Sequence, residues 1–158
     1  MLNQTTTSEP FAILLIDDDA DCRMLVRDAI EQSKVANVVH EVRNGMEALE
    51  FLSQSGPYEG VPRPGLIFLD IEMPGMDGQE CLRRIRANAD FKDIPIVMMT
   101  GVSDEAEMRR AADNGANSYT IKPASAEQFL RTVLACTNYW LTIHQYPHHH
   151  LPADKCRR

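Results

Sequence analysis

The stretch Leu66 to Gly78, LIFLDIEMPGMDG, decides the fold. Its first four residues are apolar and run directly into Asp70, and proline and glycine residues then interrupt the chain. A continuous apolar run of this length is typical of a strand that is buried on both faces of a parallel sheet. Asp70 is therefore predicted to lie at the carboxyl end of a central strand, where open α/β sheets bind their ligands. An aspartate at a strand end is also common as a helix cap or turn former.

Five apolar runs alternate with segments of helical spacing. The predicted strands are Phe11 to Ile16, Val38 to Val42, Leu66 to Leu69, Ile94 to Met99 and Asn117 to Ile121. A helical pattern follows each run, and the last one extends to Tyr139 or beyond. This alternation predicts an α/β fold, a doubly wound five-stranded parallel sheet with five helices.

Capping signals mark where the predicted helices begin. They are Asn44 with Glu47, Asp77 with Glu80, Ser103, and Ser125 with Gln128, while Gly115 is the expected terminator of the fourth helix. The basic run Arg83, Arg84 and Arg86 on the third helix predicts a solvated face.

Composition bounds the class of protein. The chain has 158 residues, 44% of them hydrophobic and 25% charged, which is ordinary for one soluble globular domain. A net charge of −7 argues against nucleic acid or an anionic membrane as a partner. We expect a flexible segment over residues 1–10, a folded domain over 11–143 and a flexible tail over 144–158.

The cysteines and the N-terminus indicate a cytoplasmic protein. The 4 cysteines lack paired metal-binding spacing, and three lie in helical patterns, which favours reduced packing residues. The first ten residues lack the pattern of a signal peptide, and no apolar segment reaches the roughly 20 residues that span a bilayer.

Polar residues follow the first, third, fourth and fifth predicted strands. They are Asp17 and Asp18, Asp70, Thr100, and Lys122. The carboxyl ends of parallel strands converge at one edge of a sheet, so these side chains can meet there. Two carboxylates about 4 Å apart repel by roughly 4 kcal/mol at an effective dielectric constant near 20. Three carboxylates and one ammonium leave a charge that a divalent cation would balance, and oxygen ligands favour Mg²⁺ or Mn²⁺ over zinc.

The remaining groups suit a phosphoryl group. A Thr100 hydroxyl and a Lys122 ammonium can bind its oxygens, and the Asp70 carboxylate can form an acyl-phosphate. Each residue also has a simpler interpretation: Asp17 to Asp19 as a capping run, Thr100 as a strand former and Lys122 as a surface residue. Their joint occurrence in this strand order favours the phosphoryl site.

These residues resemble the receiver domain of two-component response regulators, a flavodoxin-like fold, over about residues 11–136. The matching segments are ILLIDDD, LIFLDIEMPGMDG, PIVMMTG and YTIKP. The resemblance implies that Asp70 is the phospho-acceptor and that Asp17 and Asp18 are the metal acids, Asp18 as direct ligand. It adds the backbone carbonyl of Glu72 as a further metal ligand.

The resemblance also implies roles at the fourth and fifth strands. Thr100 and Lys122 would contact the phosphoryl group, and the Lys122–Pro123 bond would be cis. Tyr119 would be the aromatic residue that follows Thr100 between outward and inward positions. Glu72 departs from the commonest residues at its place, and Gly101 replaces a frequent alanine, which should expose the phosphoryl group to water.

Two segments resemble the stand-alone response regulators of phytochrome histidine kinases. They are the connection PYEGVPRPG and the ending NYWLTI, Asn138 to Ile143. That ending is either a last helical turn folded onto the domain or an apolar surface for homodimerisation, with the last two helices and the fifth strand. Only 15 residues follow Ile143, so no effector domain is expected.

The sequence thus predicts a Mg²⁺-dependent phosphorylation switch in a phosphorelay, with a sensor histidine kinase as partner, rather than an enzyme with an external substrate. One alternative is a phosphatase with an aspartyl nucleophile, because Asp17 and Asp19 have the required spacing. Another is an adaptor module that is never phosphorylated. His144, His148 to His150 and Cys156 are interpreted as parts of the tail, with no assigned function.

Overall fold

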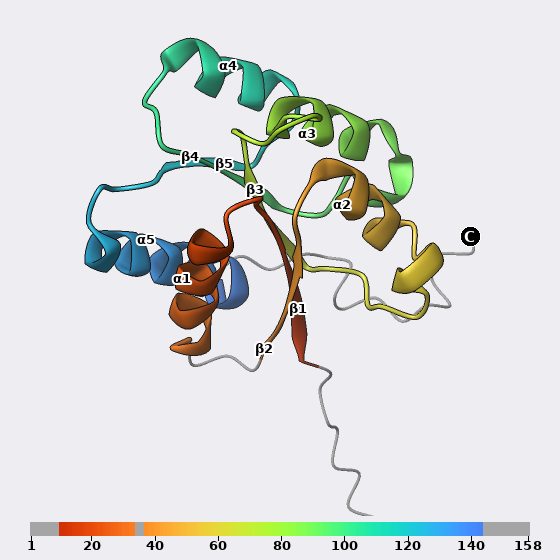
Figure 1. The fold of residues 1–158 in the computed structure, drawn as a ribbon, viewed down its shortest axis with the longest axis horizontal. Coiled ribbons are helices and arrows are strands. Elements are labelled where there is room, and N and C mark those ends of the chain that lie inside the picture. The colour runs from red at the N-terminus through yellow and green to blue at the C-terminus, as the bar shows by residue number, and fades with distance from the viewer. Residues whose placement is uncertain (1–9, 34–36, 144–158) are drawn as a thin grey trace, which may run out of the picture.

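A computed structural model describes residues 10–33 and 37–143 of the chain. Its five parallel strands form one sheet in the order β2-β1-β3-β4-β5. They are β1 (Phe11–Ile16), β2 (Asn37–Val42), β3 (Leu66–Asp70), β4 (Ile96–Thr100) and β5 (Ser118–Ile121). The predicted doubly wound parallel sheet is therefore confirmed (Figure 1).

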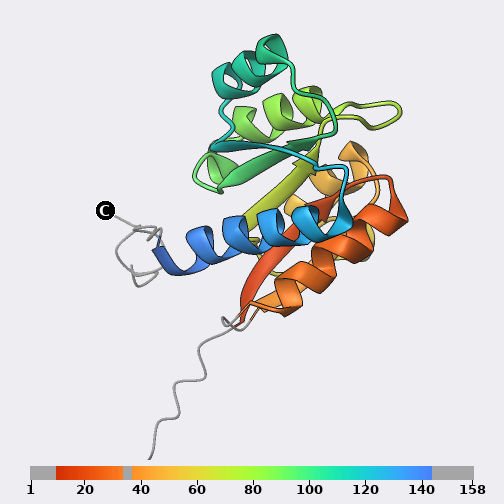
Figure 2. The same ribbon diagram turned by 90° about the vertical axis from the view of Figure 1, so that its left-hand side faces the viewer.

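Helices cover both faces of this sheet. They are α1 (Ala20–Glu31), α2 (Gly45–Leu52), α3 (Gly78–Ala87), α4 (Glu105–Asp113) and α5 (Ala126–Asn138). Helices α1 and α5 lie side by side on one face, and α2, α3 and α4 cover the other (Figures 1 and 2). Short turns of helix occupy Gly56–Tyr58 (η1), Ala89–Phe91 (η2) and Tyr139–Ile143 (η3).

Alternate residues of β1, β3 and β4 pack into two separate cores. In β1, Leu14 and Ile16 face the core under α2 and α3, whereas Ile13 and Leu15 face the core under α1 and α5. Every residue of β3 and β4 is buried. This is the burial that a continuous apolar run predicts for the inner strands of a parallel sheet.

The strand limits differ slightly from those predicted. β4 begins at Ile96 rather than at Ile94, because Pro95 has no N–H group to donate to a sheet. β5 begins at Ser118 rather than at Asn117, whose side-chain oxygen accepts a hydrogen bond from the Ile96 N–H group.

Three of the four predicted helix caps are confirmed. The side chains of Asn44, Asp77 and Ser125 accept hydrogen bonds from backbone N–H groups at the starts of α2, α3 and α5. The prediction of Ser103 is wrong, since Asp104 caps α4. Both residue types are good caps, and the aspartate charge also interacts favourably with the helix dipole. Gly115 follows α4 at a φ of 97°, as expected of a terminator.

The basic run on α3 is only partly a solvated face. Arg83 and Arg84 are exposed and pair with Glu80. Arg86 instead turns back toward the protein, where its guanidinium donates to four backbone carbonyl oxygens and to the side chain of Asn117. It joins the end of α3 to η2 and to the loops before β4 and β5, so the prediction of a solvated face is wrong for Arg86.

The segment after α5 packs onto the domain in part. Trp140 is buried in the core under α1 and α5, and Leu141 packs against that core, while Tyr139 is exposed. The prediction of a folded-back last turn is therefore confirmed for these two residues. The predicted flexible ends, the histidines from His144 onward and Cys156 lie outside the described residues.

The cysteines within the described residues are packing residues. Cys22 and Cys81 are buried, Cys136 is half-buried, and none of the three forms a disulfide. Burial raises the pKa of the Cys22 and Cys81 thiols to about 12, so both are protonated near neutral pH. Among the described helices, none is long and apolar enough to cross a membrane.

Candidate functional site

Strand register brings Asp17 and Asp70 together. In the pairing of β1 with β3, Ile16 lies opposite Leu69, and the next residue along each chain segment is an aspartate: Asp17 just after β1 and Asp70 at the end of β3. Both aspartates are buried, with exposures of 3% and 4%. Strands β2 and β3 lie on opposite sides of β1, and in sheets of this order the ligand crevice opens outside the carboxyl ends at the reversal.

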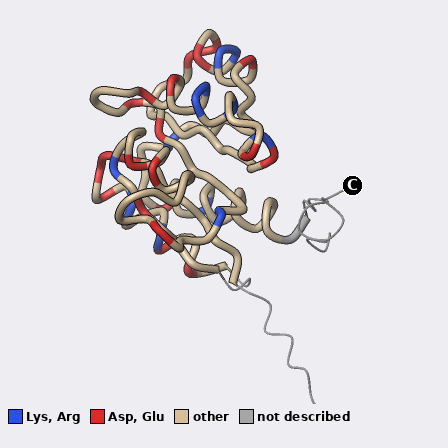
Figure 3. Tube along the Cα trace, turned by 90° about the vertical axis from the view of Figure 1, so that its right-hand side faces the viewer, with Lys and Arg blue, Asp and Glu red and all other residues tan. Residues whose placement is uncertain are grey.

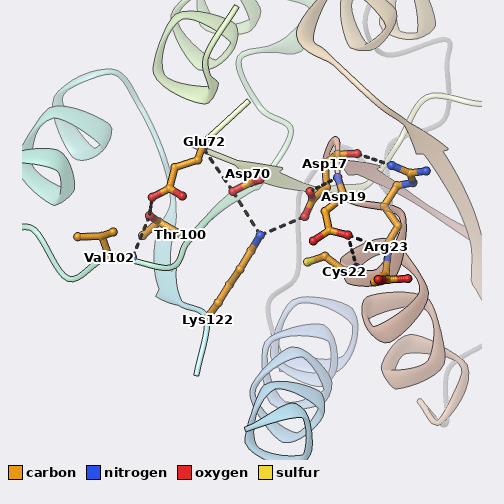
Figure 4. A network of polar contacts seen from close by, with 10 residues as sticks. Asp17, Asp19, Cys22, Arg23, Asp70, Glu72, Thr100, Val102 and Lys122 are labelled. Atoms are coloured by element: carbon orange, nitrogen blue, oxygen red, sulfur yellow. Dashed lines mark hydrogen bonds and ion pairs between the residues drawn. The ribbon is translucent and has the colours of Figure 1, made fainter. Parts of the chain in front are cut away.

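Lys122 completes this cluster from the end of β5, which β4 separates from β3 in the sheet. It follows β5, and its side chain reaches past the end of β4 to the two acids (Figure 4). Its Nζ lies 3.1 Å from Asp17 Oδ2 and 3.3 Å from Asp70 Oδ1. The convergence predicted from the strand ends is thus confirmed for these three side chains.

Burial and charge shift the protonation of the cluster. Burial raises the pKa of the Asp70 carboxyl to about 7; Asp17 adds to the rise, and Lys122 opposes it. Burial alone would lower the pKa of Lys122, but Asp17 and Asp70 outweigh it and hold that pKa above its ordinary value. The Lys122 ammonium therefore stays charged at neutral pH. Its charge alone does not offset the effect of burial on the Asp70 carboxyl.

The carboxylates offer a site that fits a hard divalent cation. One oxygen from each of Asp17, Asp18 and Asp70 lies within 4.8 Å of the others, and Asp18 is exposed at the rim. Oxygen donors are the ligands that Mg²⁺ and Mn²⁺ prefer. A cation here would also stabilise the ionised form of the Asp70 carboxyl, which burial disfavours. The donor set, the spacing and the electrostatics all suit such an ion.

Thr100 lies at the end of β4, beside the loop that carries Glu72. Its hydroxyl accepts a hydrogen bond from the Val102 N–H group at 3.3 Å and donates to Glu72 Oε1 at 3.5 Å. The Glu72 N–H group in turn donates to Asp70 Oδ1 at 3.4 Å. Thr100 is 2% exposed, and its hydroxyl is on the same side of the cluster as Glu72 (Figure 4).

Tyr119 and the Lys122–Pro123 bond lie on β5 and just after it. Tyr119 is half-buried, its hydroxyl oxygen is buried, and its ring packs against the core under α2 and α3. Burial raises the pKa of its phenol. The expected cis bond is wrong, since all described peptide bonds, this one included, are trans. The isomers of an X–Pro bond differ by only about 0.5–1 kcal/mol, so a sequence does not fix the choice.

Asp19 has a structural role. Its side chain accepts hydrogen bonds from the Asp21 and Cys22 N–H groups and caps α1. It is absent from the carboxylate cluster that includes Asp17, Asp18 and Asp70. The phosphatase alternative needed Asp19 as its second catalytic acid, and that residue is engaged as a helix cap.

Two residues that shape the site were not singled out for this role from the sequence. A Cβ atom at Gly78 would lie 2.2 Å from the backbone oxygen of Asp70, so only glycine lets α3 begin against the β3 loop. Arg23 donates to the backbone oxygen of Asp17 at 2.7 Å. In a sequence, a glycine at the start of a helix only weakly indicates that the helix lies close to another backbone segment. An arginine on an amphipathic helix does not indicate a contact with a site residue.

Comparison with known proteins agrees with the geometry. The model of the response regulator receiver domain family matches residues 13–134. Response regulator Rcp1 of Synechocystis is 33% identical over 135 residues, which cover 85% of this chain and 92% of Rcp1. The probable methanogenesis regulatory protein FilR2 of Methanothrix harundinacea is 35% identical over 140 residues, 88% of this chain and 89% of FilR2.

Solved structures give the same result. The phosphorylated cyanobacterial phytochrome response regulator RcpA superposes with a TM-score of 0.83 at 33% identity, over 87% of this chain and 99% of RcpA. The Mn²⁺-bound form of Rcp1 gives a TM-score of 0.82 at 33% identity, with the same coverage of 87% and 99%. The similarity therefore extends over nearly the whole of each relative.

Proposed function

Because this chain belongs to the response regulator receiver family, we propose that it is a single-domain phosphorylation switch whose acceptor is Asp70. The carrying observation is the contact of Lys122 with both Asp17 and Asp70 at one edge of the sheet. A sensor histidine kinase supplies the phosphoryl group. The relative RcpA, a phytochrome response regulator, favours a phytochrome-type kinase. The proposed site of action is the cytoplasm.

In the transfer step, a carboxylate oxygen of Asp70 attacks the phosphorus of a phosphohistidine. The new P–O bond forms as the P–N bond breaks, and the electron pair of that bond goes to the imidazole. Lys122 neutralises charge on one phosphoryl oxygen, and the Thr100 hydroxyl donates to another. Such a transfer depends on positioning and electrostatics, which the rigid strand ends supply.

Asp17, Asp18 and Asp70 would hold Mg²⁺ or Mn²⁺, with the backbone carbonyl of Glu72 as a further ligand. When bound, the cation supplies positive charge that offsets the negative charge of the phosphoryl oxygens. Asp17 and Asp70 also contact Lys122, so two of these acids link the cation site to the ammonium. Asp18, the exposed acid, closes the site toward solvent.

The switch follows from the added charge of roughly −1.5 to −2 at Asp70. To donate to the phosphoryl group, Thr100 exchanges its hydrogen bond with Glu72 for a new one. The space that Thr100 vacates lets Tyr119 move inward, which alters the surface of α4, β5 and α5. This surface carries the homodimer contact and the change in partner affinity. The only reaction that the protein catalyses is its own phosphorylation and dephosphorylation.

The test is labelling by a small phosphodonor such as acetyl phosphate, with and without Mg²⁺. The wild-type protein is expected to acquire one label that requires Mg²⁺ and has the lability of an acyl-phosphate. Asp70→Asn is expected to abolish it, and the control Asp19→Asn, which changes a helix cap, to retain it. Undiminished labelling of Asp70→Asn would reject the proposed acceptor.

A further inference from the structure

We propose that Arg23 is a positioning residue for the cation site, holding the peptide that joins Asp17 to Asp18. Arg23 lies in the first turn of α1, and its Nη1 donates to the backbone oxygen of Asp17 at 2.7 Å (Figure 4). The inference rests on the proposed function, since it assigns Arg23 a task only if the acids bind a cation.

Arg23 is itself held by Glu41 of β2. Its Nε lies 3.4 Å from Glu41 Oε1, and the other oxygen of Glu41 pairs with Arg27, one turn further along α1. The side chains of Arg23 and Glu41 are only 14% and 21% exposed. The guanidinium is therefore fixed at one end by a carboxylate of the neighbouring strand and at the other by the carbonyl of Asp17.

This carbonyl controls the direction of Asp18. The peptide bond is planar, so fixing the oxygen of residue 17 also fixes the N–H group of residue 18 and the path of the chain into its Cα atom. The Asp17 side chain has other supports, since it accepts from the Asp19 N–H group at 2.9 Å and from Lys122 at 3.1 Å. Asp18, exposed at the rim, depends on the backbone to aim its carboxylate.

Two effects of Arg23 on cation affinity have opposite signs. As a charge alone, a guanidinium near a divalent cation repels it, so removing the charge would tighten binding. As a positioning group, Arg23 orders a ligand before the cation arrives, so removing it would weaken binding. Loss of a group that orients metal ligands typically costs about 10–100-fold in affinity, which exceeds the repulsion of a screened charge already paired with Glu41.

The matched control is Arg27. It carries the same charge on the same helix and binds the same carboxylate, and among the described residues its ion pair is with Glu41 rather than with a residue of the cation site. Arg27→Gln and Arg23→Gln remove equal charge, so a difference between them reports the contact with Asp17. Arg23→Lys retains the charge but cannot reproduce the two-ended geometry of a guanidinium.

The experiment is titration of the purified full chain with Mg²⁺, followed by calorimetry and by the backbone amide resonance of Asp18. Arg23→Gln is expected to raise the dissociation constant by about tenfold or more. Arg23→Lys is expected to recover only part of that loss, and Arg27→Gln to stay within about twofold of wild type. The Asp18 resonance of the metal-free protein is expected to shift in Arg23→Gln and not in Arg27→Gln.

Unchanged or tighter Mg²⁺ binding by Arg23→Gln, or equal losses in Arg23→Gln and Arg27→Gln, would overturn the assignment. If Arg23→Gln does not fold, Glu41→Gln tests the same point, since it releases Arg23 without touching Asp17 and is expected to weaken binding by a smaller factor. A wild-type protein that binds no Mg²⁺ would instead refute the proposed function, so the two failures are distinct.

Discussion

Lys122 Nζ lies 3.3 Å from Asp70 Oδ1, although β5 and β3 are separated in the sheet by β4. The lysine stem spans the end of the intervening strand, so the ammonium meets an acid from a strand that is not its neighbour. Residues 52 positions apart, from 70 to 122, thereby form one charge cluster. The following predictions test what this contact and its surroundings contribute.

Removal of the ammonium should destabilise the metal-free protein. Lys122→Met leaves Asp17 and Asp70 buried without their positive partner. We expect the free energy of unfolding to fall by about 1–3 kcal/mol at neutral pH, measured by urea denaturation without divalent cations. The control is Lys92→Met, since Lys92 is exposed. Equal stability of the two variants would show that the contacts of Lys122 with Asp17 and Asp70 do not stabilise the fold.

Asp70 should make stability depend on pH. An aspartate carboxyl ordinarily has a pKa of 3.8, and burial raises that of Asp70 to about 7. Between these values the folded state binds more protons than the unfolded state, so this group lowers stability as the pH rises. Asp70→Asn removes the penalty and should raise the Tm of the metal-free protein by about 2–8 °C at a pH above 7.

That advantage of Asp70→Asn should shrink as the pH falls toward 4, because wild-type Asp70 is then protonated in the folded state. Thermal unfolding of both proteins in chelator across this range measures the difference. A constant difference at all pH values would contradict the raised pKa.

Gly78 should be intolerant of a methyl group. In Gly78→Ala, the new Cβ atom would clash with the backbone of Asp70 and Ile71, so α3 and the β3 loop must separate. We expect a loss of about 1–3 kcal/mol in the free energy of unfolding and a marked loss of labelling at Asp70. Denaturation and phosphodonor labelling measure the two effects.

Gly101→Ala is the matched control for Gly78→Ala, since an added Cβ atom there has no heavy atom within 4 Å. It should leave stability near that of wild type. On the proposed function, we expect the added methyl group to shield the phosphoryl group from water and so to lengthen the lifetime of the acyl-phosphate. A shorter lifetime would contradict the expected exposure at Gly101.

Gln79 should anchor α4 to α3. It is 1% exposed, and its Nε2 donates to the Glu107 backbone oxygen at 3.0 Å and to Glu107 Oε2 at 2.9 Å. In α4, Ala111 is the buried residue, so this helix has few other ties to the domain. Gln79→Leu should cost about 1–3 kcal/mol and speed amide exchange in α4. Exchange in α4 as slow as in wild type would refute the anchor.

Much of the site could be predicted because its determinants are local. Four of the five apolar runs, those that form β1, β3, β4 and β5, end at or just before a polar residue of the candidate site, and the parallel arrangement brings those ends to one edge. The sign of the net charge was also available from composition, since the chain has 23 acidic and 16 basic residues. In the part of the chain that the structure describes, residues of both signs are distributed over the elements (Figure 3).

The features that the sequence did not predict depend on long-range contacts. Arg86 binds Gly115 and Asn117, which are 29 and 31 residues away, so its helix alone suggested a solvated face. Arg23 of α1 pairs with Glu41 of β2, a residue on the next element of the chain. The choice between Ser103 and Asp104 as the cap of α4 depends on the path of the chain between the end of β4 and the start of α4. The neighbouring residues do not determine that path.

The most direct test of the account locates the phosphoryl group on the chain. The protein is incubated with Mg²⁺ and a phosphodonor, and then reduced with borohydride, which converts an aspartyl phosphate to homoserine. Peptide sequencing by mass spectrometry is expected to find homoserine at position 70 and at no other aspartate. Homoserine at position 17, 18 or 19, or its absence from position 70 in labelled protein, would contradict the central claim.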